Sequence, residues 1–159
     1  DVARVARLGV VASVQPVFIP TDWEPAAKRW GPERCRYAYA WKSLLQAGLR
    51  LQFGSDAPVE PINPIYGIHA AVTRQTLTGQ PQGGWFPEQQ LSLEDCITGF
   101  TAAAAWSTRR EDKLGSIEPG KWADLTIYGQ DLFHLPAENW PDVEIEMTVV
   151  SGEVVYNKA

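Results

Sequence analysis

The stretch that decides the fold expected for this chain is Leu49–Pro61, LRLQFGSDAPVEP, in which an apolar run ends abruptly at glycine, serine and aspartate. The apolar half contains no turn signal and predicts a buried strand, Gly54 allows backbone geometry that other residues resist, and Pro58 prevents the strand from continuing. Asp56 therefore stands at the carboxyl end of that strand, where a carboxylate can bind a metal or take a proton from water. The alternative is that Asp56 only caps the following turn, which aspartate often does.

The composition is that of a globular protein and excludes a nucleic-acid footprint. Of the 159 residues, 45% are hydrophobic and 21% are charged, which provides enough apolar material for a sizeable core. The formal charge is −5, and the largest basic cluster is the pair Arg109-Arg110, which Glu111-Asp112 follow directly. A nucleic-acid-binding surface needs a basic patch, so we expect no such partner.

The sequence also gives expectations for the membrane and for the cellular compartment. No run approaches the roughly 20 apolar residues that a spanning helix needs, so no membrane association is expected. The two cysteines, Cys35 and Cys96, lie far apart in chemically different segments, which favours a reduced cytoplasmic protein. A disulfide between them stays open at this point.

The first third of the chain reads as a strand, a loop, a helix and a second strand. Val10–Val14 is an apolar strand, and Pro20–Arg36 carries several prolines and alternating charge, which predicts a long loop. Tyr37–Ala47 has one apolar face and predicts a helix that leads directly into the strand Leu49–Phe53. This order is typical of a βαβ unit with parallel strands.

The remainder predicts two more helices followed by a small β unit. A helix is expected over Ile65–Thr78, a loop over Gly79–Pro87, and a further helix with Ser92 as its N-cap that runs through Trp106. From Leu114 onward the pattern is one of strands and tight turns, with a hairpin around Ser151-Gly152-Glu153.

Three stretches together carry a family resemblance: FGSDAPVEPINPIYGIHAAVTR at 53–74, GGWFPEQQLSLED at 83–95 and LGSIEPGKWADLTI at 114–127. The chain resembles the amidohydrolase superfamily and within it the amidohydrolase-3 branch, which includes the N-substituted formamide deformylases. The resemblance implies an α/β fold, the C-terminal fragment of a metal-dependent (β/α)8 TIM barrel followed by part of a small β-sandwich. Residues 1–113 would contain barrel strands seven and eight, and residues 114–159 the returning strands of the sandwich.

The resemblance also implies a role for Asp56, as a ligand of the active-site divalent metal and as the general base toward the attacking water. We expect that metal, zinc, in the full-length parent and none in the isolated chain, because the family's other ligands should lie upstream of Asp1.

Other polar and aromatic side chains are weaker candidates for a substrate-binding site. Gln15, at the mouth of the first strand, could touch substrate or satisfy loop backbone groups, and Arg74 could orient an acidic substrate group or form a helix-surface ion pair. Trp85 lies in a glycine-rich loop that suits either a lid over substrate or plain packing. His69 is expected to be a structural imidazole inside a helix, and His134 falls in a loop beyond the barrel.

The function expected from these observations is hydrolysis of a C–N bond in a small-molecule amide, formamide or N-acyl substrate, with this chain as an inactive C-terminal fragment. The alternatives are a non-catalytic binding or self-associating domain from a degenerate barrel, and a different metal-dependent reaction such as deamination. Self-association of the isolated chain is expected in either case, because strands without neighbours leave unpaired edges.

Overall fold

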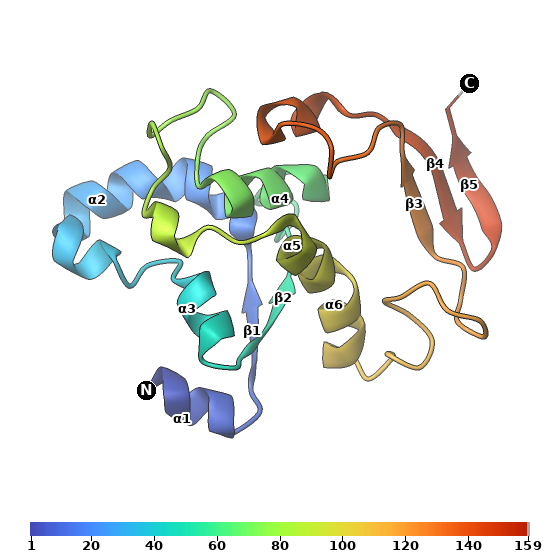
Figure 1. Ribbon diagram of the computed structural model, residues 1–159, viewed down its shortest axis with the longest axis horizontal. Coiled ribbons are helices and arrows are strands. Elements are labelled where there is room, and N and C mark those ends of the chain that lie inside the picture. The colour runs from blue at the N-terminus through green and yellow to red at the C-terminus, as the bar shows by residue number, and fades with distance from the viewer. Residues whose placement is uncertain (159) are drawn as a thin grey trace.

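Two separate sheets organise the chain, an α/β protein whose computed structural model describes residues 1–158 (Figure 1). Strands β1 (Val11–Val14) and β2 (Arg50–Phe53) pair in parallel, in register from Val11 opposite Arg50 to Val14 opposite Phe53. Strands β3 (Leu125–Tyr128), β4 (Ile145–Val150) and β5 (Glu153–Asn157) form an antiparallel sheet in the order β3-β4-β5.

Helical segments make up just under half of the rest of the described chain. They are α1 (Val2–Arg7), η1 (Pro16–Phe18), α2 (Ile19–Cys35), α3 (Trp41–Gln46), α4 (Pro64–Thr73), η2 (Pro87–Gln89), α5 (Leu93–Phe100), α6 (Ala102–Ser107) and η3 (Ala137–Asp142). Within residues 1–158, none of these helices is both long enough and apolar enough to cross a membrane.

The two strands expected in the first third are confirmed, and they pair in parallel as predicted. The loop expected over Pro20–Arg36 is wrong, because this segment is the helix α2. Pro20 lies in its first turn, where proline costs no hydrogen bond, and Gly31 (φ 70°) kinks the helix so that Pro32 begins a second helical part. Only Pro25 is interior, so counting prolines without their positions overstated the breaks.

Two predicted helices are shorter than expected, because residues in the left-handed conformation interrupt them. Tyr39 (φ 52°) precedes α3, which leaves the first residues of the predicted helix Tyr37–Ala47 outside it. Arg74 (φ 60°) ends α4 and stops the predicted helix Ile65–Thr78 at Thr73. Leu77, which falls beyond the end of α4, is exposed.

The N-cap predicted at Ser92 is confirmed as a complete capping box. The Ser92 hydroxyl accepts a hydrogen bond from the Asp95 backbone N–H at 3.1 Å, and the Asp95 carboxylate accepts one from the Ser92 N–H at 3.3 Å. The predicted helix is interrupted at Thr101, whose backbone is non-helical and whose hydroxyl donates to the Ile97 carbonyl at 2.6 Å. The segment therefore forms two helices, α5 and α6, where one was expected.

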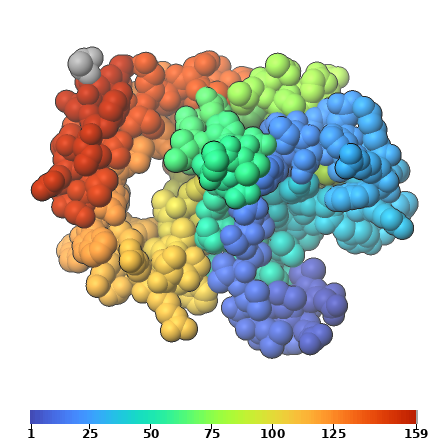
Figure 2. All heavy atoms as spheres, turned by 180° about the vertical axis from the view of Figure 1, so that it is seen from behind, coloured from blue at the N-terminus to red at the C-terminus, as the bar shows by residue number. Residues whose placement is uncertain are grey.

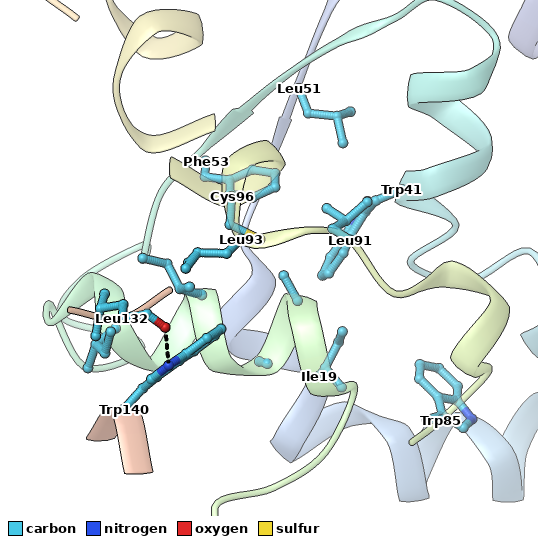
Figure 3. Packing of buried hydrophobic residues seen from close by; sticks show 14 of the residues in the cluster. Ile19, Trp41, Leu51, Phe53, Trp85, Leu91, Leu93, Cys96, Leu132 and Trp140 are labelled. Carbon is cyan, nitrogen blue, oxygen red and sulfur yellow. Dashed lines mark hydrogen bonds between the residues drawn. The ribbon is translucent and has the colours of Figure 1, made fainter. Parts of the chain in front are cut away.

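The core lies between one face of the parallel pair and the helices that cover it (Figure 3). Leu51 and Phe53 point to this face and are buried. Helix α5 comes unusually close to β2 at Gly99, where a Cβ atom would lie 2.8 Å from the Phe53 ring. The Phe53 ring also meets that of Phe100 edge-on, with centroids 5.5 Å apart. Glycine at this helix position is thus a packing requirement.

The segment before β4 packs against the helical part through buried residues that include Trp140 and Leu132. Trp140 in η3 is buried, and its indole N–H donates to the Leu132 carbonyl at 3.0 Å (Figure 3). Helix η3 packs against α4. Elsewhere the sheet stands apart, and Figure 2 shows an opening between it and the helices, where β3, α4 and α5 line a groove of about 600 Å³.

The hairpin expected around Ser151-Gly152-Glu153 is confirmed as the connection from β4 to β5. Ser151 (φ 52°) and Gly152 (φ 83°) both have positive φ, which is the two-residue turn that matches the twist of antiparallel strands. The Asp124 carboxylate accepts a hydrogen bond from the Ser151 N–H at 2.7 Å and fixes the turn to the residue before β3.

Candidate functional site

The carboxyl edge of the parallel pair brings Gln15 and Asp56 to the same end of the sheet. The pairing continues one residue past the strands, because the Gly54 N–H donates to the Val14 carbonyl at 3.1 Å. Gln15 therefore follows β1 at the level where the chain leaves β2 toward Asp56. Ligands of parallel α/β sheets bind outside the carboxyl ends of the strands, which makes this edge the candidate site.

Asp56 presents an exposed carboxylate that the local turn does not use. The Val59 N–H donates to the Asp56 backbone carbonyl at 2.9 Å, so the main chain closes the turn, and the carboxylate is not among the hydrogen-bonded side chains of residues 1–158. Asp56 has φ 58°, a left-handed conformation that aspartate tolerates better than most residues. Gly54, expected to need such freedom, has no positive φ, so the special backbone position belongs to Asp56.

A hydrogen bond across 39 residues ties the turn after Asp56 to the helix that follows β1. The Thr21 hydroxyl in the first turn of α2 donates to the Glu60 carboxylate at 3.1 Å. The segments that leave the carboxyl ends of β1 and β2 are therefore connected to each other by a side-chain hydrogen bond. The sequence holds no local signal for this contact.

Gln15 also lines an open cavity of about 970 Å³ beside β1. Ser13, Tyr39, Trp41 and Glu88 are among the other residues that line it. Asp56 is not among these lining residues. The site therefore has two parts in residues 1–158, a free carboxylate above the strands and a cavity beside them.

The residues present do not complete a metal site by themselves. Within the described residues 1–158, no group of three or more His, Cys, Asp or Glu side chains is arranged to hold a metal ion. Asp56 fits the chemistry of one oxygen ligand, whereas catalytic zinc sites use three protein ligands. The described residues alone therefore do not supply the ligands of a catalytic metal ion.

Neither histidine lies beside Asp56 in a ligand cluster. His134 is exposed and contacts the Asp131 carboxylate at 2.6 Å, an interaction that lowers the pKa of Asp131. His69 is 4% exposed inside α4, and its Nδ1 has no hydrogen-bond partner. Burial lowers the pKa of His69, while the charge of Glu138 opposes the shift. His69 is thus a buried structural imidazole, as expected.

His69 is expected to make the fold less stable in mild acid. Because its pKa is lower in the folded state, the unfolded chain binds more protons as the pH falls through about 6.5. The free energy of unfolding should therefore decrease as the pH is lowered, and it should level off below the pKa that His69 has in the folded state. Denaturant unfolding between about pH 7 and pH 5 measures this. His69→Gln should flatten the curve, and an unchanged slope in that variant, or an equal flattening in His134→Gln, would contradict the assignment.

Arg74 is fully buried, which corrects the expectation of a helix-surface ion pair. Its Nε donates to the Trp85 carbonyl and its Nη1 to the Tyr39 carbonyl, each at 2.8 Å. Trp85 is 7% exposed, and its ring lies 5.8 Å from that of Tyr39, so it packs in the core. In this structure both Arg74 and Trp85 contact other parts of the chain.

Comparison with known proteins decides the family. The model of the amidohydrolase family matches residues 1–156. The chain belongs to this family. It is 32% identical over 99% of its length to the YtcJ protein of Bacillus subtilis, of which it covers 30%. It is 26% identical over 98% of its length to N-substituted formamide deformylase of Arthrobacter pascens, of which it covers 28%. The chain thus spans less than a third of the length of these relatives.

Solved structures support the same family. A metal-dependent hydrolase from Pyrococcus horikoshii is 34% identical with a TM-score of 0.65, over 76% of this amidohydrolase chain and 24% of that one. An amidohydrolase from Thermotoga maritima matches 99% of this chain and 34% of its own, with a TM-score of 0.69 at 21% identity. At that identity the second likeness concerns the fold alone.

Proposed function

We propose that the parent of this chain is a metal-dependent amidohydrolase that hydrolyses a C–N bond in a small-molecule amide, formamide or N-acyl substrate. In this proposal residues 1–113 supply strands seven and eight of a (β/α)8 barrel, with β1 and β2 in those places, and residues 114–159 supply part of a β-sandwich. The parallel pairing of β1 and β2 and the antiparallel sheet β3-β4-β5 support it. So does the printed name of the formamide deformylase relative.

The observation that carries the proposal is the unpartnered carboxylate of Asp56 at the carboxyl edge of parallel strands. In hydrolysis such a carboxylate accepts the proton of the attacking water, a contribution of about a hundredfold or more in rate. A divalent metal, zinc in this proposal, would polarise the substrate carbonyl. Asp56 would supply one of its ligands, and residues elsewhere in the longer parent would supply the others.

Two further elements of the proposal concern the environment of the chain. Cys35 and Cys96 are free and buried, as thiols are in a reducing compartment, and we include a cytoplasmic location on that ground. β1 pairs only with β2 among the described strands, so self-association of the isolated chain through this edge stays a prediction.

The direct test is metal analysis and a substrate panel on the full-length parent. We expect a divalent ion that survives dialysis, and turnover of N-substituted formamides or N-acyl compounds that chelation abolishes and added metal restores. The isolated 159-residue chain should retain no stoichiometric metal under the same dialysis. A parent that is metal-free and inactive on every C–N substrate would contradict the proposal and favour a binding protein.

A further inference from the structure

Arg74 is a buried cation that forms no salt bridge in the described chain, and the charge of Glu88 only partly offsets the effect of burial on its pKa. The residue is 0% exposed, and the ion pairs of residues 1–158 do not include it. Burial lowers the pKa of Arg74 to about 10, so the group is still charged at neutral pH. A buried charge costs several kcal/mol unless it is well hydrogen-bonded.

The hydrogen bonds of Arg74 show what the guanidinium does. It lies over the rings of Trp41 and Trp85, at 5.4 and 5.5 Å from their centroids. Nε and Nη1 each donate to a backbone carbonyl, whereas Nη2 is buried without a partner. The side chain thus donates hydrogen bonds to main-chain carbonyls in two loops that are far apart in sequence.

Two reciprocal hydrogen bonds hold the first of these loops against the end of α4. The Trp85 N–H donates to the Arg74 carbonyl at 2.9 Å, while the Arg74 Nε donates back to the Trp85 carbonyl at 2.8 Å. The preceding Gly84 passes so close that a Cβ there would lie 2.5 Å from the Thr73 carbonyl. The segment 75–90 is therefore held against the end of α4 by a specific pair of bonds.

The second loop is the connection from α2 to α3. The Arg74 Nη1 donates to the carbonyl of Tyr39, a residue in the left-handed conformation. The Tyr39 hydroxyl in turn donates to the Asp22 carboxylate in the first turn of α2. Tyr39 and Trp41 both line the cavity that contains Gln15. Arg74 thus lies directly behind one wall of that cavity without opening into it.

We infer that Arg74 is a positioning residue: it connects the segment that follows β1 to the segment that follows β2, and so fixes the part of the cavity wall that Tyr39 and Trp41 form. This inference rests on the proposed function, because it assigns the wall a role in holding substrate. Helix α4 belongs to the connection after β2 and packs on η1, which begins the connection after β1. A planar fork of donors can reach both carbonyls at once, and a lysine ammonium cannot reproduce that geometry.

The first part of the test is amide hydrogen exchange on the full-length parent. In Arg74→Met, the hydrogen-bonded amides of Trp41 and Trp85 should exchange at least about tenfold faster, because both loops lose the same anchor. The matched control is Arg50→Met, which also removes a guanidinium from a tryptophan face (Trp106, 4.0 Å) but at the opposite end of β2. Unchanged exchange in Arg74→Met, or acceleration of only one loop, would overturn the inference.

The second part compares steady-state kinetics on the best substrate of the panel. For Arg74→Lys we expect KM to rise about tenfold while kcat changes by less than about threefold, because binding geometry is lost and chemistry is not. Guanidinium ion at sub-denaturing concentration should restore the KM of Arg74→Ala and should not alter Arg50→Ala. This rescue also provides the reading if Arg74→Lys fails to fold. Wild-type KM in a folded Arg74→Lys variant would overturn the inference alone, whereas an inactive wild type would overturn the proposed function and the inference with it.

Discussion

Replacing Asp56 by asparagine in the full-length parent is expected to lower turnover by at least about a hundredfold, the lower end of what a general base supplies. Asparagine keeps the size of the side chain but removes the negative charge that binds metal and accepts a proton. Metal retention should fall together with turnover, because a neutral amide is a poorer ligand than a carboxylate.

The same variant should keep its melting temperature. The turn after Asp56 is closed by the main chain, and asparagine adopts the left-handed conformation of this position as readily as aspartate. A turn-capping role predicts the reverse, a stability loss of about 1 kcal/mol with near-normal turnover. Asp112→Asn, an exposed aspartate in the loop after α6, is the matched control and should change neither quantity. Normal turnover of Asp56→Asn with full metal occupancy would contradict the assignment.

The elements that the sequence predicts correctly are those whose signals are local. The strand ending at Phe53 is bounded by its own apolar run and by a following proline, and the capping box at Ser92 is complete within four residues. The hairpin at Ser151 is likewise specified by the turn residues themselves. The place of Asp56 after the carboxyl end of β2 could be predicted, because it depends only on where such a strand ends.

What the sequence does not predict depends on contacts between distant segments. Arg74 stops α4 in the left-handed conformation, and the carbonyls of Tyr39 and Trp85 stabilise it there, 35 and 11 residues away. The sequence does not predict helix α2 for a different reason, because proline is tolerated in the first turn of a helix. Gly31 divides the segment into two helical parts, so Pro32 also lies in a first turn. The cavity wall beside Gln15 depends on both features, so no local pattern could have described it.

Truncating Phe53 is expected to be among the most destabilising single changes in the core. Phe53 is 3% exposed and packs against the rings of Trp41 and Phe100. Phe53→Ala should lower the free energy of unfolding by about 3–5 kcal/mol, the cost of a lost aromatic ring and the cavity that it leaves. Denaturant unfolding of the parent and of the variant, compared at equal m-value, provides the measurement.

The effect of Gly99→Ala on the free energy of unfolding should depend on the residue at position 53. We expect this substitution to destabilise the wild type and to stabilise the Phe53→Ala variant. In the wild type, Gly99→Ala places a methyl group 2.8 Å from the Phe53 ring and should destabilise by about 1–3 kcal/mol, even though alanine favours a helix by about 1 kcal/mol. In the Phe53→Ala background the clash is absent, so the methyl group occupies part of the cavity and the helix preference is realised. Gly99→Ala should then be stabilising, and the four proteins of the double-mutant cycle give a coupling of opposite sign to each single effect.

The matched control is Gly67→Ala, where the added Cβ would lie 3.2 Å from Phe100. It should show no such reversal in the Phe53→Ala background. Equal destabilisation by Gly99→Ala in both backgrounds would mean that α5 and β2 are not in the close contact on which the helix layer of the parallel pair depends.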